Sequence, residues 1–202
     1  MRPEAGSLRL PRTLHGRTRS DVAASSRQQC FVRSQQGGPL DDKIQEAINA
    51  QIGLEMYSGY MYLAMTAHFA EQNFEGFARW MRLQAQEELE HAMRLYDYIL
   101  ERGGHVELGA LKAPPDEFGS PLQIFEAALA HEEEVTSKIH ALYALAREKS
   151  DYATEMHLQW FVQEQVEEEA QAGLAVEQLR RASDNMSALL MLDHRFGQRG
   201  DA

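Results

Sequence analysis

The sequence of 202 residues has one cysteine and no long apolar run, and each scarcity excludes a class of protein. Cys30 has no second cysteine to pair with, so an intrachain disulfide and multi-cysteine zinc or iron–sulfur sites are excluded. No apolar stretch approaches the roughly 18–20 residues that a membrane span requires. The N-terminus also lacks the apolar segment of a secretory signal. We therefore expect no membrane partner and a reducing compartment, the cytoplasm.

Positive charge is scarce as well. The chain has 20 Lys and Arg against 31 Asp and Glu, a net charge of −11, which argues against nucleic acid as a partner. The imbalance is uneven, because residues 1–38 hold seven Arg against Glu4 and Asp21, a net +5 that leaves −16 for the rest. An acidic body suits a protein that gathers metal cations, although acidity more often serves solubility.

The basic N-terminal stretch has no apolar period. Residues 1–38 are rich in Arg, Ser and Gly, so we expect a disordered basic tail, followed by one domain over residues 39–202. The Arg and Ser bias resembles an organelle transit peptide, and a misplaced upstream start or an added leader would give the same composition. All three interpretations stay open, and the first would place the protein in an organelle.

Four long segments repeat apolar residues at helical spacing, and a shorter one follows. Helices are predicted over roughly 41–70, 74–102, 120–149 and 151–182, with a short fifth helix over 188–196. Only a few residues join the first segment to the second and the third to the fourth, so each pair is expected to form an antiparallel hairpin.

End signals support these boundaries. Asp41 or Asp42 can cap the first helix, and Asn73 is expected to open the second. Ser120-Pro121-Leu122-Gln123 is a capping box, and Gly103-Gly104 is a typical helix stop.

The link between Arg102 and Ser120 is longer than the others. At roughly 3.3 Å per residue it can reach about 60 Å, beyond the roughly 40 Å of each long helix. It can therefore run the full length of a bundle. We predict an all-α protein: a four-helix bundle with one long crossover and a short C-terminal fifth helix.

Polar side chains interrupt the apolar stripe of each long segment, where core residues are expected. They include a Glu-x-x-His pair, Glu88 and His91. Gln84 lies on the same stripe as that pair, and the set considered as metal ligands is Glu55, Glu88, His91, Glu132, Gln165 and Glu168. Burying one unpaired carboxylate costs several kcal/mol, so four in one core are tolerable only if cations join them. The stripes therefore predict a metal site.

The ligand types narrow the choice of metal. Hard carboxylate oxygens with a single imidazole suit Fe or Mn, and Zn(II) could compete for the same cluster. Four carboxylates supply a charge of −4, which balances two Fe(II) ions. A pair of iron ions would leave the filled site close to neutral.

The order of these elements resembles the ferritin-like di-iron pattern, and the closest resemblance is to the non-haem bacterial ferritins. It covers residues 41 to about 196. A lone Glu-x-x-His recurs by chance, whereas four elements in order on four helices are specific. The matching segments are Leu54-Glu55-Met56-Tyr57-Ser58, Phe74-Glu75-Gly76, Ala85-Gln86-Glu87-Glu88, His131-Glu132 and Gln159-Trp160-Phe161-Val162-Gln163-Glu164-Gln165.

The resemblance implies a role for each polar stripe residue. Glu55, Glu88 and His91 would form the first iron site of a ferroxidase centre, and Glu88 would bridge to the second iron. Glu132 and Glu168 would complete the second iron site. Gln165 stands where bacterioferritins carry the Glu of a second Glu-x-x-His, so the chain departs towards the non-haem branch. No haem is expected.

Further positions match by resemblance alone. Glu87, Glu164 and Glu167, together with Glu168, match a third iron site, although a solvated helix face explains Glu167 equally well. Tyr62 lies two turns from Glu55 and could donate an electron or hydrogen-bond a ligand, or merely pack in the core. No role is assigned to His68, His105, His131, His140, His157 or His194, which lack partner spacing.

The implied function is iron storage. Fe(II) would be oxidised by O2 or H2O2 at a di-iron centre and deposited as a ferric mineral inside a hollow homo-oligomeric shell, of twenty-four subunits in that family. The uncharged Gln165 would hold the second iron less tightly and favour release to the mineral. The alternative is a di-iron oxygenase or peroxidase with another substrate. A metal-free structural bundle would leave the buried charges unexplained.

Overall fold

The computed structural model describes residues 39–182 and 185–200, so the predicted tail over 1–38 lies outside the described residues. Within the described ranges every regular element is a helix, as predicted, and none is both long and apolar enough to cross a membrane. The helices are α2 (Asp42–Glu71), α3 (Glu75–Glu101), α4 (Pro121–Glu148), α5 (Tyr152–Ala182) and α6 (Met186–Phe196).

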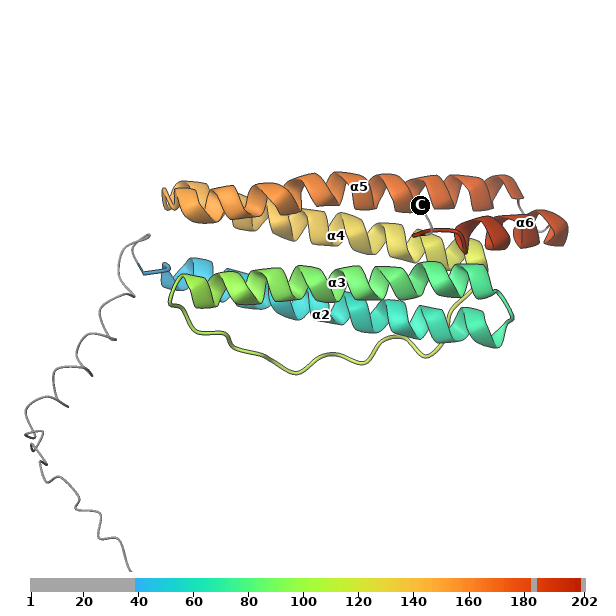
Figure 1. Cartoon of the computed structure of the whole chain (residues 1–202), viewed down its shortest axis with the longest axis horizontal. Helices are drawn as coiled ribbons and strands as arrows, with labels where there is room; N and C mark the ends of the chain where they lie inside the picture. Colours follow the sequence, from blue (N-terminus) through green and yellow to red (C-terminus); the bar gives the residue numbers. More distant parts are fainter. Residues whose placement is uncertain (1–38, 183–184, 201–202) are drawn as a thin grey trace, which may run out of the picture. The chain divides into compact units, whose positions relative to one another are not determined.

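The four long helices form two antiparallel hairpins, α2 with α3 and α4 with α5 (Figure 1). The connection from α3 to α4 returns along the bundle beside α2, so that α3 and α4 run in the same direction (Figure 1). Side chains of α2 hold this connection by its backbone: Gln45 Oε1 accepts from His105 N at 2.7 Å, and Asn49 Nδ2 donates to His105 O at 3.0 Å. The predicted crossover is confirmed.

Most helix ends follow the predicted chemistry. The carboxylate of Asp41 accepts a hydrogen bond from Lys43 N, and Ser120 and Gln123 form the reciprocal capping box. Gly103 follows α3 with a φ of 71°, the left-handed conformation that glycine adopts without strain.

Two helix starts differ from the prediction. Asn73 does not open α3: it takes a left-handed φ of 61°, and Phe74 occupies the cap position without a side-chain cap hydrogen bond. An asparagine tolerates the left-handed turn, so it serves the link between the helices instead. Helix α6 starts two residues before the predicted Ala188, because Asn185 Oδ1 accepts from Ala188 N at 3.2 Å.

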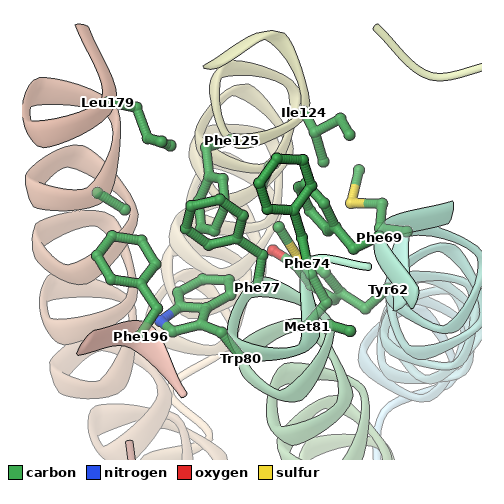
Figure 2. Close-up of a cluster of buried hydrophobic side chains, with 14 of the residues drawn as sticks. Tyr62, Phe69, Phe74, Phe77, Trp80, Met81, Ile124, Phe125, Leu179 and Phe196 are labelled. Atoms are coloured by element: carbon green, nitrogen blue, oxygen red, sulfur yellow. The ribbon is translucent and has the colours of Figure 1, made fainter. Parts of the chain in front are cut away.

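The core divides into two apolar clusters along the bundle. One is rich in aromatic rings: Phe77 and Phe125 pack against the α6 residue Phe196, and Phe69 packs against Phe77 (Figure 2). The other is mainly aliphatic and includes Ile48, Ile139 and Leu158. On every long helix the predicted polar positions fall between residues of the two clusters. A polar layer therefore separates two apolar halves of one bundle.

The short helix α6 is fixed against the start of α3. Phe77 N donates to Asp193 Oδ1 at 2.8 Å, so a carboxylate of α6 satisfies a free backbone donor of α3. A Cβ on Gly76 would lie 1.7 Å from the carbonyl oxygen of Asp193, so this contact requires glycine. The close approach directs the residues after α6 back along α3.

Candidate metal centre

The polar layer gathers the side chains that the sequence predicted as iron ligands. They come from all four long helices, and none exposes more than 5% of its surface. Placement follows from the helical stripe, which turns each of these positions towards the bundle axis. The layer contains Glu55 from α2, Glu88 and His91 from α3, Glu132 from α4, and Gln165 and Glu168 from α5.

Three of these residues form a first group. Glu55, Glu88 and His91 each offer a ligand atom, and the three atoms lie within 4.8 Å of one another. Glu88 Oε2 lies 3.6 Å from His91 Nδ1, and Gln51 Nε2 donates to Glu55 Oε1 at 2.8 Å. The other oxygen of Glu55 and both oxygens of Glu88 are buried without a hydrogen-bond partner. Acceptors left bare in this way are the complement of a cation.

Burial changes the protonation of this first group. It raises the pKa of Glu55 to about 7, with a further increase from the charge of Glu132. Burial, together with the neighbouring Glu55, holds the pKa of Glu88 well above its usual value. The pKa of His91 falls to about 4, because burial and the charge of Arg94 both oppose the imidazolium. His91 is therefore neutral near pH 7, the form that binds metals.

A second group lies across the layer, where α4 meets α5. Gln165 Nε2 donates to Glu132 Oε2 at 3.4 Å and to Thr136 Oγ1 at 3.2 Å. Gln84 Nε2 donates to Glu168 Oε2 at 2.5 Å. Burial and the charge of Glu132 raise the pKa of Glu168 to about 8. Amide donors thus hold one oxygen of each carboxylate in this group.

Tyr62 belongs to the same layer. It is fully buried, and its hydroxyl donates to Glu132 Oε1. Burial and the nearby charge of Glu132 hold the pKa of Tyr62 well above its usual value, so the phenol keeps its proton. Two functional roles were considered for Tyr62, and the hydrogen bond to a candidate ligand is the one present in the structure.

The residues matched to a third iron site do not all meet. Ligand atoms of Glu164 and Glu168 lie within 4.8 Å of each other and of His91. Glu87 instead pairs with Arg199, with 2.7 Å between Oε2 and Nη2. Glu167 is exposed, and over 39–182 and 185–200 it joins no group of three possible ligands. Burial raises the pKa of both Glu87 and Glu164.

Several contacts of the layer were not predicted. Gln51 lies one turn before Glu55, and Gln84 stood in the predicted stripe, yet neither was assigned a bond to a carboxylate. His131, which was given no role, has its Nε2 2.7 Å from Ser58 Oγ. The spacing of Gln51 and Gln84 on the inner stripes was the signal available. The hydrogen bond from Arg199 to Gln84 had no such signal, because it joins residues 115 apart in the chain.

The arrangement fits divalent cations that accept oxygen and imidazole ligands. It offers four buried carboxyl groups and one neutral imidazole, and bare oxygens face one another at the first group. Such donors favour Fe(II), Mn(II) or Zn(II) over soft-ligand metals. A bound cation would also replace the protons that these raised pKa values retain near neutrality.

Known proteins share the pattern. A family model described as a ferritin-like domain matches residues 45–182. A bacterial non-heme ferritin of Bacteroides fragilis (strain 638R) is 41% identical over 160 residues, covering 79% of this chain and 99% of the relative. One from Staphylococcus aureus (strain MRSA252) is 39% identical, with 79% and 96% covered. An open pore ferritin of the hyperthermophilic archaeon Archaeoglobus fulgidus superposes with a TM-score of 0.78 at 48% identity, covering 79% of this chain and 99% of that one.

Proposed function

Because the chain belongs to the ferritin family, we propose that it stores iron by oxidising Fe(II) at the polar layer and releasing Fe(III) to a mineral. The observation that carries the proposal is the first group of ligands. Three carboxylate oxygens of Glu55 and Glu88 are buried without any donor, beside the neutral imidazole of His91. In a protein without a bound cation such oxygens only cost free energy.

Each ligand has a defined part in the proposed reaction. Glu55 and His91 hold the first Fe(II), Glu88 bridges to the second, and Glu132 and Glu168 complete the second site. Two Fe(II) ions give up one electron each, and O2 takes both electrons with two protons to leave as H2O2. When H2O2 is the oxidant, its O–O bond breaks and two water molecules form with two protons. The preorganised carboxylates stabilise the higher charge of Fe(III).

Gln165 supports release of the product. Its amide donates to Glu132 and brings no charge of its own to the second site. The second metal ion is therefore held by fewer anions than a Glu at this position would supply. An ion oxidised there can leave for a mineral instead of remaining as a permanent cofactor.

A homo-oligomeric shell would enclose the mineral. Large apolar side chains are exposed on the α2–α3 hairpin, a surface suited to contacts with second copies of the chain. They are Tyr60, Leu63, Leu89, Met93 and Leu100. The acidic balance of the chain suits the cation-rich interior of such a shell. We further propose a cytoplasmic location, where a single cysteine stays reduced.

The test compares iron oxidation by Glu88→Gln and by Glu90→Gln. Glu90 is an exposed carboxylate two residues away on α3, so its replacement removes the same charge without touching the layer. Stopped-flow absorbance after mixing Fe(II) with O2, and separately with H2O2, should show rapid oxidation in the wild type and Glu90→Gln only. Equal rates in both variants would refute the proposed site.

A second candidate rests on a groove between α2 and α4. Its volume is about 960 Å³, and its lining includes Gln51, which bonds to Glu55. An organic substrate entering here would approach the first group, as in a di-iron oxygenase or peroxidase. Light scattering discriminates between the two functions. A large shell that grows an iron core supports storage, whereas a monomer or dimer without a core supports the second candidate.

A further inference from the structure

A guanidinium from the end of the chain reaches the metal layer. Arg199 lies in the turn after α6, and only 18% of its side chain is exposed. Nη1 donates to Gln84 Oε1, Nη2 donates to Glu87 Oε2 at 2.7 Å, and Cζ lies 4.7 Å from the ring centre of Trp80. The Asp193 contact with the start of α3 delivers the segment to this place.

The contact with Gln84 determines which way its amide points. A guanidinium can only donate, so it selects the orientation with Oε1 towards Arg199. In that orientation Nε2 faces Glu168 and donates to its Oε2 at 2.5 Å. The reversed amide would place an oxygen against a carboxylate. Gln84 is fully buried while Arg199 is in place, so water does not compete with the guanidinium for its Oε1.

The contact with Glu87 has the opposite effect on metal binding. Glu87 is matched to the third iron site, and Arg199 already neutralises it with a charged hydrogen bond. A third metal ion near Glu164 and Glu168 would have to displace this guanidinium or bind without Glu87. Either route costs affinity, because a fixed positive charge beside the site opposes a cation.

We propose that Arg199 is a positioning residue that orders the layer, strengthening the second metal site through Gln84 and Glu168 while occupying Glu87 against a third ion. This inference rests on the proposed function. Because Arg199 occupies Glu87, the third site fills only after the first two metal ions are bound. Filling the third site then requires the C-terminal segment to move. Arg199 is not itself a candidate ligand, and it acts through Gln84, through Glu87 and through the positive charge that it places near Glu168.

The two contacts predict effects of opposite sign, which a general loosening of the fold would not produce. Zn(II) serves as a redox-inert probe, titrated calorimetrically into the assembled apo-protein at pH 7. Arg199→Gln should weaken the second site about tenfold, the effect of one charge-assisted hydrogen bond, and strengthen the third site by a similar factor. Adding Glu164→Gln removes a third-site ligand, so the loss at the second site can then be measured alone.

Three further variants separate the contacts. Gln84→Leu keeps the Arg199–Glu87 pair and should weaken the second site without strengthening the third. Arg199→Lys retains the charge but cannot fork between two partners, so it should restore the suppression of the third site only. Arg195→Gln removes an exposed positive charge from α6 and should bind Zn(II) as the wild type does.

Wild-type affinities in Arg199→Gln would overturn the inference, and so would equal weakening of all sites together with a lower Tm. If Arg199→Gln does not assemble, Gln84→Leu decides: an unchanged second site refutes the proposed relay. Failure of the proposed function has a different signature. In that case the wild type binds no pair of Zn(II) ions, and Glu88→Gln changes nothing.

Discussion

The hydroxyl of Tyr62 on α2 donates a hydrogen bond to Oε1 of Glu132 on α4, deep in the bundle where both side chains are buried. Gln165 on α5 donates to the other oxygen of the same carboxylate at 3.4 Å. Hydrogen bonds from α2 and α5 thus fix the orientation of Glu132, a candidate ligand on α4. Burial raises the pKa of Glu132 above its usual value, and the hydrogen bonds from Tyr62 and Gln165 offset part of that rise.

Tyr62→Phe tests this relationship. The ring stays, so packing is preserved, but Glu132 loses a donor and its carboxylate becomes harder to ionise. We expect Zn(II) binding at the second site to weaken roughly tenfold at pH 7, with an unchanged first site. Calorimetric titration gives both affinities. Tyr60→Phe, at an exposed position on the same helix, is the control and should match the wild type.

Metal binding should release protons near neutrality. The pKa of Glu55 is about 7 and that of Glu168 about 8, so both carboxyls are partly protonated at pH 7 and must ionise to bind a cation. Zn(II) affinity should therefore fall as the pH is lowered from 8 to 6. His91, with a pKa of about 4, contributes nothing in that window. Calorimetry in two buffers of different ionisation enthalpy counts the protons, and a pH-independent affinity would contradict the prediction.

The same burial predicts that Glu88→Gln stabilises the metal-free protein. A carboxyl whose pKa rises above its usual 4.5 on folding binds its proton more tightly in the folded state, so stability falls as the pH rises from 4.5 towards the folded pKa. Glutamine removes this cost. With a chelator at pH 7.5 we expect a gain on the order of 1–3 kcal/mol in the free energy of unfolding, shrinking towards pH 4.5.

Chemical denaturation at both pH values measures this difference. Glu90→Gln, at an exposed position, should change little at either pH. A loss of stability in Glu88→Gln at pH 7.5 would show that the carboxylate is stabilised by a contact other than a metal ion.

Gln165→Glu should make the second metal site retain the oxidised iron instead of releasing it. The substitution adds an anion beside Glu132 and removes the amide donor. The apo-protein should lose stability through repulsion, while the second Zn(II) binds at least tenfold more tightly. After one round of Fe(II) oxidation, more Fe(III) should remain on the desalted protein than on the wild type. Gln163→Glu, at an exposed position on α5, adds the same charge outside the layer. Equal retention in both variants would disprove the role of Gln165.

The fold could be predicted because its signals are local. Apolar spacing gave the helices, Asp41 and the Ser120–Gln123 box gave their starts, and the length of the link after Arg102 gave the parallel pair α3 and α4. Asn73 misled because asparagine suits both a helix cap and a left-handed turn. Only the packing of the neighbouring helix decides between those conformations.

The candidate site also has a part that the sequence predicts and a part that it does not. Five candidate ligands could be predicted because each is a polar residue on an apolar stripe, and the structure brings them into one layer. They are Glu55, Glu88, His91, Glu132 and Glu168. The donors that orient them were not predictable, since a helix stripe gives the direction of a side chain but not its partner on another helix. Arg199 is the extreme case, because its contact with Gln84 depends on how α6 lies against Gly76.

Chain ends are usually where fusion tags and truncations are tolerated. Here the close contact between Gly76 and Asp193 fixes α6 against α3. Arg199, just after α6, donates a hydrogen bond to Gln84 in the polar layer. Inserted peptides are therefore better placed in the exposed crossover around Gly109, where an added Cβ meets nothing within 4 Å.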